Sequence, residues 1–278
     1  MTVQPIQLPG TETHLLRSEF VGDEFEISII PPLPGVGPVP VVYLTDGNAA
    51  AGAAASAVPM LVMGGEIPPV LTVTIGYPDP AMWLQKRMRD FPPTVDAQQV
   101  GEIAALVGLG SVESGGGPKF LDFLTNELRP WIKERYEVTN DSTYFGDSAG
   151  GLFGTWTLFH RPSAFNRYII GSPWLCWDEK VSTGWEAEYA ASHSDLNATV
   201  FLAAGAEEDV LGPYAPAWIT STFARADTAG HTRRLGEALA GRNYPNLRVT
   251  TRILPEETHF TLSTVLMTQG LRNVFARR

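Results

Sequence analysis

The chain has 278 residues, of which 44% are hydrophobic and 18% are charged, a composition typical of a globular protein. Its 30 acidic and 20 basic residues give a formal net charge of −10, which argues against binding to nucleic acid or to an anionic membrane surface. The single cysteine, Cys176, excludes an internal disulfide and a cysteine-based zinc site, so we expect no metal and no cofactor.

No Ser/Gly linker or charge block divides the chain, so we expect a single domain over residues 1–278. The N-terminal stretch lacks a basic patch followed by an apolar run, and no later stretch is apolar for about 18 residues. These features favour a cytoplasmic protein without a membrane span, whose partner is a small molecule. The sequence gives no indication of the oligomeric state.

The segments "THLLRSEFV" and "EFEISIIPP" predict an antiparallel hairpin around Gly22 and Asp23, because the second of them alternates hydrophobic and polar residues. Six further strands are predicted at 41–44, 70–75, 143–145, 168–170, 200–203 and 249–253. Helices are predicted at 97–107, 120–136, 151–160, 231–240 and 260–275. Pro130 should kink or divide the second of these helices. Together the elements predict an α/β fold with a mostly parallel, eight-stranded sheet and helices on both faces.

The segment 77–117 is rich in Pro, Gly and Asp and is longer than an ordinary connection. It is either a disordered excursion or a lid that shapes a pocket. Trp83, Met88 and Phe91 would be poor choices for a solvated tail, so we favour the lid.

The residues Gly146-Asp147-Ser148-Ala149-Gly150 fit G-x-S-x-G, the turn that exposes a nucleophilic serine between a strand and a helix. In a chain with 27 glycines this motif can also arise by chance. The presence of an acid and a base at suitable positions therefore decides whether Ser148 is a nucleophile. In such sheets the acid and the base follow the serine in that order along the chain. His259, between the last predicted strand and the C-terminal helix, has the position of the base.

Three acidic residues, Glu207, Glu208 and Asp209, follow a predicted strand where the acid is expected, and we favour Glu208. At least two of the three belong to a solvated turn. The donors for an oxyanion are predicted to be the backbone N–H of Ala149 and that of Gly47 or Asn48. The alternative for the second donor is an ordinary Asp-Gly turn.

Several motifs in this order resemble the α/β-hydrolase esterases that include esterase D and the enterochelin (siderophore) esterases. The resemblance runs from about residue 41 to the C-terminus. It rests on "VVYLTDGNA", "RMRDFPPT", "GGGPKFLDFLTNELRPWI", the run from "FGDSAGG" to the Ser-Pro-x-x-x-Trp segment, and "PEETHFTL". It implies an α/β-hydrolase fold with Ser148 as nucleophile, His259 as base and an acid near Glu208.

The resemblance also implies candidate substrate-binding residues, namely Asp46, Arg87, Trp174 and Trp177. In the family the Ser-Pro-x-x-x-Trp loop borders the active site, so the two tryptophans either line the pocket or pack in the core. Arg87 either binds a negatively charged substrate or forms a structural ion pair with Asp90, and we favour the ion pair.

These observations predict a serine carboxylic-ester hydrolase that forms an acyl-enzyme on siderophore-like or small acyl esters. The alternatives are an acyltransferase on the same fold and a non-catalytic binding protein that keeps the fold. The chain departs from the resemblance in having only a short hairpin at its start where some siderophore esterases carry a further domain. Its acidic balance also does not indicate a pocket for a polyanionic ferric siderophore.

Overall fold

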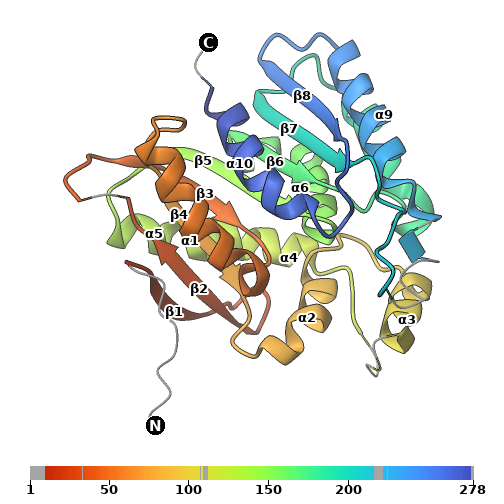
Figure 1. Cartoon of the computed structure of the whole chain (residues 1–278), viewed down its shortest axis with the longest axis horizontal. Coiled ribbons are helices and arrows are strands. Elements are labelled where there is room, and N and C mark those ends of the chain that lie inside the picture. The colour runs from red at the N-terminus through yellow and green to blue at the C-terminus, as the bar shows by residue number, and fades with distance from the viewer. Residues whose placement is uncertain are drawn as a thin grey trace.

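A computed structural model describes residues 10–32, 34–106, 108, 112–215, 222–223 and 225–276. Within these ranges eight strands form one sheet in the order β1-β2-β4-β3-β5-β6-β7-β8 (Figure 1). The strands are β1 (Glu12–Arg17), β2 (Glu24–Ile30), β3 (Val39–Leu44), β4 (Leu71–Gly76), β5 (Val138–Asp147), β6 (Arg167–Gly171), β7 (Ala198–Gly205) and β8 (Leu247–Leu254).

Strand β2 pairs antiparallel with β1 and with β4, and all other neighbouring strands are parallel. This confirms both the predicted hairpin and the mostly parallel, eight-stranded sheet. The carboxyl ends of β3, β5, β6, β7 and β8 therefore meet at one edge of the sheet, where sites form in folds of this kind.

Helices cover both faces of the sheet. The principal ones are α1 (Gly47–Met63), α2 (Trp83–Asp90), α3 (Ala97–Leu106), α4 (Gly117–Asp122), α5 (Arg129–Arg135), α6 (Ala149–His160), α7 (Trp185–Ala190), α9 (Thr228–Gly241) and α10 (Leu262–Val274). Helices α1 and α10 pack together on the front of the sheet in Figure 1, over a core that includes Val42, Phe145 and Leu266. The opposite face buries a larger core that includes Tyr144, Phe153 and Leu239.

Pro130 lies in the first turn of α5, and a π-helical turn, Phe123–Leu128, separates α5 from α4. The backbone stays helical through residues 117–135, and the change of hydrogen-bond pattern falls just before this proline, which has no N–H to donate to the preceding turn. Whether Pro130 kinks the helix stays a prediction. Helices α1, α2 and α7 were not predicted. In α1 the buried residues include Ala50, Ala54 and Val58 at four-residue spacing, and alanines give little hydrophobic contrast between the two faces.

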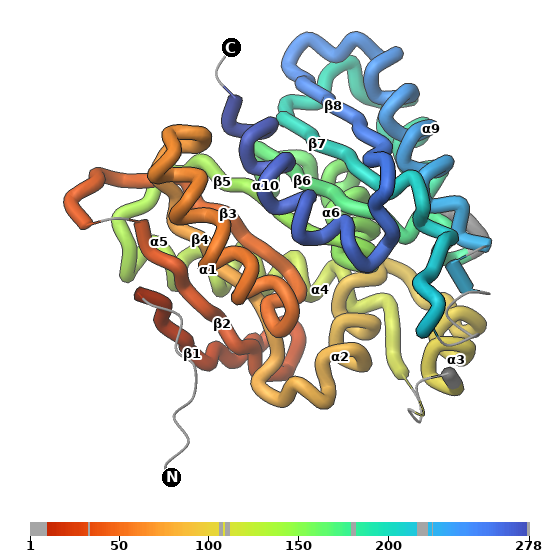
Figure 2. The backbone as a smooth tube through the Cα atoms, viewed as in Figure 1, coloured from red at the N-terminus to blue at the C-terminus, as the bar shows by residue number. Residues whose placement is uncertain are grey.

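The segment 77–117 contains the helices α2 and α3. Residues 107 and 109–111 of this segment lie outside the described ranges. Figure 2 shows both helices beyond the end of the sheet to which the carboxyl ends of β7 and β8 point. The predicted lid is therefore a folded excursion beside the edge where a site is expected, and whether it moves stays a prediction.

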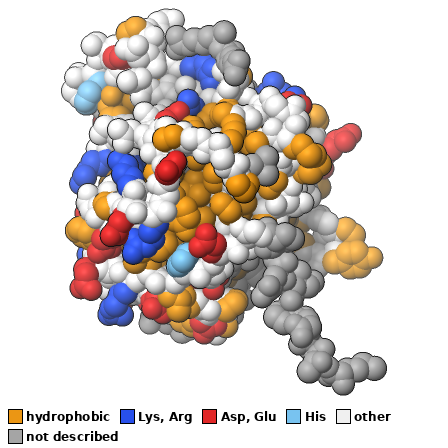
Figure 3. All heavy atoms as spheres, turned by 90° about the vertical axis from the view of Figure 1, so that its left-hand side faces the viewer, with side chains coloured by type: hydrophobic (Ala, Val, Ile, Leu, Met, Phe, Trp, Pro, Cys, Tyr) orange, Lys and Arg blue, Asp and Glu red, His pale blue; other side chains and the backbone are white. Residues whose placement is uncertain are grey.

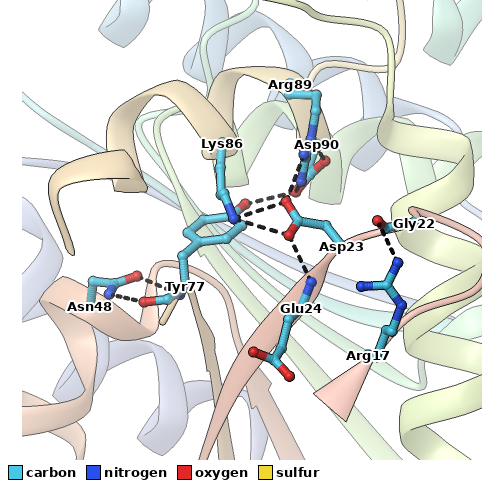
Figure 4. Close-up of polar contacts among 9 residues, drawn as sticks. All are labelled: Arg17, Gly22, Asp23, Glu24, Asn48, Tyr77, Lys86, Arg89 and Asp90. Atoms are coloured by element: carbon cyan, nitrogen blue, oxygen red, sulfur yellow. Dashed lines mark hydrogen bonds and ion pairs between the residues drawn. The ribbon is translucent and has the colours of Figure 1, made fainter. Parts of the chain in front are cut away.

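A cluster of charged side chains joins the β1–β2 hairpin to α2 (Figure 4). Asp23, in the hairpin turn, accepts hydrogen bonds from Lys86 at 3.0 Å and from Arg89 at 2.8 Å. Arg89 also donates to Asp90, whose carboxylate accepts a further bond from the buried Tyr77 hydroxyl. Burial raises the pKa of Asp23, but the hydrogen bonds from Lys86 and Arg89 outweigh it and lower this pKa to about 2. The carboxylate therefore stays ionised and fixes α2 against the hairpin.

Among the described residues no helix combines the length and the hydropathy needed to cross a bilayer. On the side of the molecule shown in Figure 3, basic and acidic side chains are interspersed next to an area of hydrophobic ones. Among the described residues on that side, charged side chains of one sign form no extended surface.

Candidate active site

Ser148 stands at a sharp turn between β5 and α6, at the edge formed by the carboxyl ends of the strands. Its backbone has φ 59° and ψ −118°, a region that residues with a side chain rarely adopt and that is held only by the surrounding structure. Gly146 makes the turn sterically allowed, since a Cβ atom there would come within 2.5 Å of the Gly150 carbonyl oxygen. The motif found in the sequence is thus a strained elbow that presents the serine hydroxyl.

The structure brings Ser148, His259 and Glu208 together in one chain of hydrogen bonds. His259 Nε2 lies 3.0 Å from Ser148 Oγ, and His259 Nδ1 lies 2.6 Å from Glu208 Oε2. His259 is supplied by the loop between β8 and α10, as expected from its position in the sequence. Gly205 at the end of β7 lets this loop approach, because a Cβ atom there would lie 2.1 Å from the Glu257 carbonyl oxygen.

Glu208 is the acidic residue of its loop that contacts His259, whereas Asp209 is exposed and Glu207 is half-buried. Its other carboxylate oxygen, Oε1, accepts bonds from the Ser172 hydroxyl at 2.5 Å and from the Gly205 N–H at 2.8 Å. Burial raises the pKa of Glu208, but the hydrogen bonds from His259, Ser172 and Gly205 outweigh it, so the net pKa lies below its ordinary value. Glu208 is therefore a carboxylate at neutral pH and can hold His259 with a proton on Nδ1.

Ser172, which the sequence analysis did not single out, donates a hydrogen bond to the Glu208 carboxylate. It follows β6 directly, is fully buried, and has a φ of 35°, so its hydroxyl is held in place for Glu208. The one signal in the sequence was its place in the Ser-Pro-x-x-x-Trp segment.

Replacing Ser172 by alanine is expected to lower kcat by roughly tenfold, because a hydrogen bond to a buried charge is lost while the triad remains. Steady-state hydrolysis of a short aryl ester measures this effect. The matched control is Ser182→Ala, which removes a buried hydroxyl bonded to the Leu175 carbonyl and not to Glu208. Equal losses in the two variants would contradict a positioning role for Ser172.

Asp46 and Arg87 form a bidentate ion pair, with Arg87 Nε 2.7 Å from Asp46 Oδ1 and Nη2 2.9 Å from Oδ2. Trp83 Nε1 donates a third bond to the same carboxylate at 2.8 Å. The predicted pair between Arg87 and Asp90 is wrong, because Arg89 takes Asp90 while Arg87 points to the loop after β3. The guanidinium of Arg87 is thus already balanced by a carboxylate.

The predicted donors for an oxyanion lie in two places. Ala149 begins α6 directly after Ser148 and lines the cavity described below. Asn48 is turned toward β4, where its side-chain amide exchanges two hydrogen bonds of 2.8 Å with the backbone of Tyr77. Neither Gly47 nor Asn48 is part of the cavity wall, whereas Asp46 is.

A cavity of about 430 Å³ lies beside Ser148 and His259. Its wall is mainly apolar and includes Trp83, Ile103, Trp174, Trp177, Phe223 and Phe260. Trp174 is 8% exposed and Trp177 is 1% exposed, so both predicted roles, pocket lining and core packing, describe these tryptophans. The sequence analysis did not identify Ile103, Phe223 and Phe260 as wall residues, since they come from separate segments that only the fold brings together. Among the described residues no cluster of His, Cys, Asp and Glu could hold a metal ion.

The sheet order and the elbow at its carboxyl edge define an α/β-hydrolase-like fold, and the comparisons agree. The structure superimposes on the BES protein from Bacillus cereus with a TM-score of 0.82 and 26% identity, over 100% of this chain and 99% of that one. The siderophore hydrolase EstA from Aspergillus nidulans gives a TM-score of 0.82 at 20% identity, over 98% of this chain and 97% of the other.

The chain belongs to the esterase family described as "Putative esterase", whose pattern matches residues 18–239. It is similar to the ferri-bacillibactin esterase BesA of Bacillus subtilis (strain 168), with 27% identity over 98% of this chain and 91% of the relative. It is 33% identical over 191 residues to the siderophore triacetylfusarinine C esterase of Aspergillus fumigatus, covering 63% of this chain and 59% of that one. The protein is accordingly an enzyme of the esterase class, and its reaction is ester hydrolysis.

Proposed function

We propose that the protein is a serine carboxylic-ester hydrolase that uses Ser148, His259 and Glu208 as a catalytic triad. The observation that carries this proposal is the unbroken line of hydrogen bonds from Glu208 through His259 to Ser148, beside an apolar cavity. A serine hydroxyl is a weak nucleophile, and a base at hydrogen-bond distance is what activates it. The strained backbone of Ser148 holds the hydroxyl toward that base.

The reaction proceeds in two halves. His259 Nε2 removes the hydroxyl proton while Ser148 Oγ attacks the ester carbonyl, and the same proton then passes to the leaving alcohol. Water enters, loses a proton to His259 and hydrolyses the acyl-enzyme, which restores Ser148. Glu208 stays ionised throughout and stabilises the imidazolium that forms in each half.

The oxyanion of each tetrahedral intermediate needs preorganised N–H donors. The Ala149 N–H, at the start of α6, supplies one of them and benefits from the positive end of that helix. For the second donor we propose the backbone N–H of Asp46, because this residue lines the cavity while Gly47 and Asn48 do not. The bonds from Arg87 and Trp83 fix the Asp46 side chain and so hold this loop in one position.

For the substrate we propose a siderophore-like ester or a small acyl ester. The names of the relatives support the first, and a mainly apolar cavity of about 430 Å³ has room for a substantial acyl or alcohol group. Ester hydrolysis in this site requires no cofactor, since the triad and the backbone donors supply every proton transfer and charge stabilisation.

A fluorophosphonate activity probe tests the mechanism, because it modifies an activated serine and not a merely exposed one. We expect a single adduct, located by peptide mass spectrometry on Ser148, and its loss in His259→Ala. The matched control is His193→Ala, which removes a histidine from a surface loop and should leave labelling unchanged. Labelling that persists at Ser148 in His259→Ala would contradict the proposed base, and an adduct on another serine would contradict the nucleophile.

A further inference from the structure

One carboxylate in the cavity has no part in the mechanism above. Asp147 is the last residue of β5, directly before Ser148, and it lines the cavity. Its Oδ1 atom is shielded from solvent and lies over Gly171 of β6, where a Cβ atom would come within 2.7 Å. No hydrogen-bond donor in the described part of the chain reaches this oxygen.

The charges around the cavity leave Asp147 unbalanced. Among the described wall residues the charged side chains are Asp46, Arg87 and Asp147. Arg87, the cation of the three, is held by both oxygens of Asp46, and Trp83 adds a third bond to that carboxylate. Behind the serine, Glu208 adds a further negative charge next to His259. A substrate in this cavity therefore meets an excess of negative charge.

We propose that Asp147 sets the charge selectivity of this site: esters with a cationic group near the scissile bond are preferred over neutral ones, and anionic esters are disfavoured. This inference rests on the function proposed above. A charge beside a mainly apolar cavity wall is screened less than one at the open surface, so a cation placed next to Asp147 is attracted more strongly there. An ammonium group in the substrate supplies a positive charge that balances this carboxylate, and a quaternary ammonium does so without a hydrogen bond.

The charge on Asp147 depends on pH in a range that can be measured. Four groups act electrostatically on it: His259 from the loop before α10, Arg87 from α2, Glu208 from the loop after β7 and Asp46 from the loop after β3. Burial is the main cause that raises the pKa of Asp147 to about 6; Glu208 and Asp46 raise it further, while His259 and Arg87 lower it. The carboxylate is therefore charged at pH 8 and is largely neutral at pH 5.

Two isosteric pairs of esters test the proposal on both sides of the scissile bond. The first is acetylcholine and 3,3-dimethylbutyl acetate, and the second is methyl 4-(trimethylammonio)butyrate and methyl 5,5-dimethylhexanoate. Acid release in a pH-stat gives kcat/KM for each ester, and the measured quantity is the cationic-to-neutral ratio within each pair. This ratio cancels the pH dependence of the chemical step, because both members of a pair need the same base.

We expect the ratio at pH 8 to be at least about tenfold higher in the wild type than in Asp147→Asn for one pair or both. In the wild type it should fall as the pH drops through about 6, whereas in Asp147→Asn it should not change with pH. The matched control is Asp209→Asn, which removes an exposed carboxylate outside the cavity wall and should keep the wild-type ratio. The pH profile of the wild type tests the same point without any substitution.

Equal ratios in the wild type and in Asp147→Asn would overturn the proposal. A preference for the cation that persists in Asp147→Asn would then belong to the aromatic wall, which also attracts cations. If the esters are turned over too slowly, two isosteric aryl trifluoroketones, one with a trimethylammonio and one with a tert-butyl group, give the same ratio as protection of Ser148 from the fluorophosphonate probe. Absence of probe labelling and of hydrolysis of the neutral esters would contradict the proposed function itself.

Discussion

Substituting Ser148 or His259 by alanine is expected to lower kcat for ester hydrolysis by at least about 10⁴-fold, and the double variant should lose little more. The reason is that neither residue works alone: the hydroxyl at 3.0 Å from Nε2 is a nucleophile only while the imidazole accepts its proton. Steady-state kinetics of the two single variants and the double variant, with a neutral aryl ester as substrate, measures both the loss of kcat and its non-additivity.

Thermal unfolding provides the control for these substitutions. Neither side chain fills a large part of the core, and Ser148→Ala removes only one hydroxyl, so the melting temperature should stay close to that of the wild type. His193→Ala serves as the matched histidine substitution and should keep full activity. Turnover within tenfold of the wild type in folded Ser148→Ala or His259→Ala would remove the proposed mechanism.

Substituting Glu208 by glutamine is expected to lower kcat by about 10³- to 10⁴-fold while leaving KM nearly unchanged. The amide keeps the shape of the side chain but removes the charge that stabilises the imidazolium, and it offers the wrong partner to the Nδ1 proton. Steady-state kinetics at pH 7 to 8 is informative here, because the lowered pKa of Glu208 makes it a carboxylate throughout that range.

The neighbouring acidic residues provide matched controls in the same loop. Glu207→Gln and Asp209→Asn remove the same charge from a half-buried and an exposed position, and each should retain activity within about twofold of the wild type. Three similar small losses would show that the triad has no essential acid or that the acid lies elsewhere.

The strands were predictable because each shows a short β-rich run between turn residues, and their alternation with helices implied the parallel sheet. Helix α1 was not, because it buries mainly small residues such as Ala50 and Ala54 and includes Pro59, so its hydrophobic pattern is weak. Helix α2 was hidden for a different reason, since it begins after a Pro- and Asp-rich stretch that reads as a loop.

Ser148 and His259 could be predicted because a local motif and a fixed chain order specify their positions. The choice of Glu208 among three acids depends on which side chain points inward, and that follows from the close approach of two loops. The predicted ion-pair partner of Arg87 was wrong because it was chosen by proximity in the sequence, which suggested Asp90. In the fold the partner is Asp46, which lies 41 positions away along the chain. Ile103, Phe223 and Phe260 gave no local signal, since their place in the wall exists only through contacts between distant segments. Ser172 gave only its place in the Ser-Pro-x-x-x-Trp segment, which does not show its contact with Glu208.

Helix α2 lines the cavity with one set of side chains and contacts the β1–β2 hairpin with another. Trp83, Leu84, Arg87 and Met88 face the cavity, whereas Lys86 and Arg89 bind the hairpin turn at Asp23. Substitutions on the first set can change what the enzyme accepts while the helix keeps its attachment to the sheet. The helix is therefore a place where substrate range can diverge between relatives without the fold having to be rebuilt, and the hairpin that opens the chain is part of what permits this.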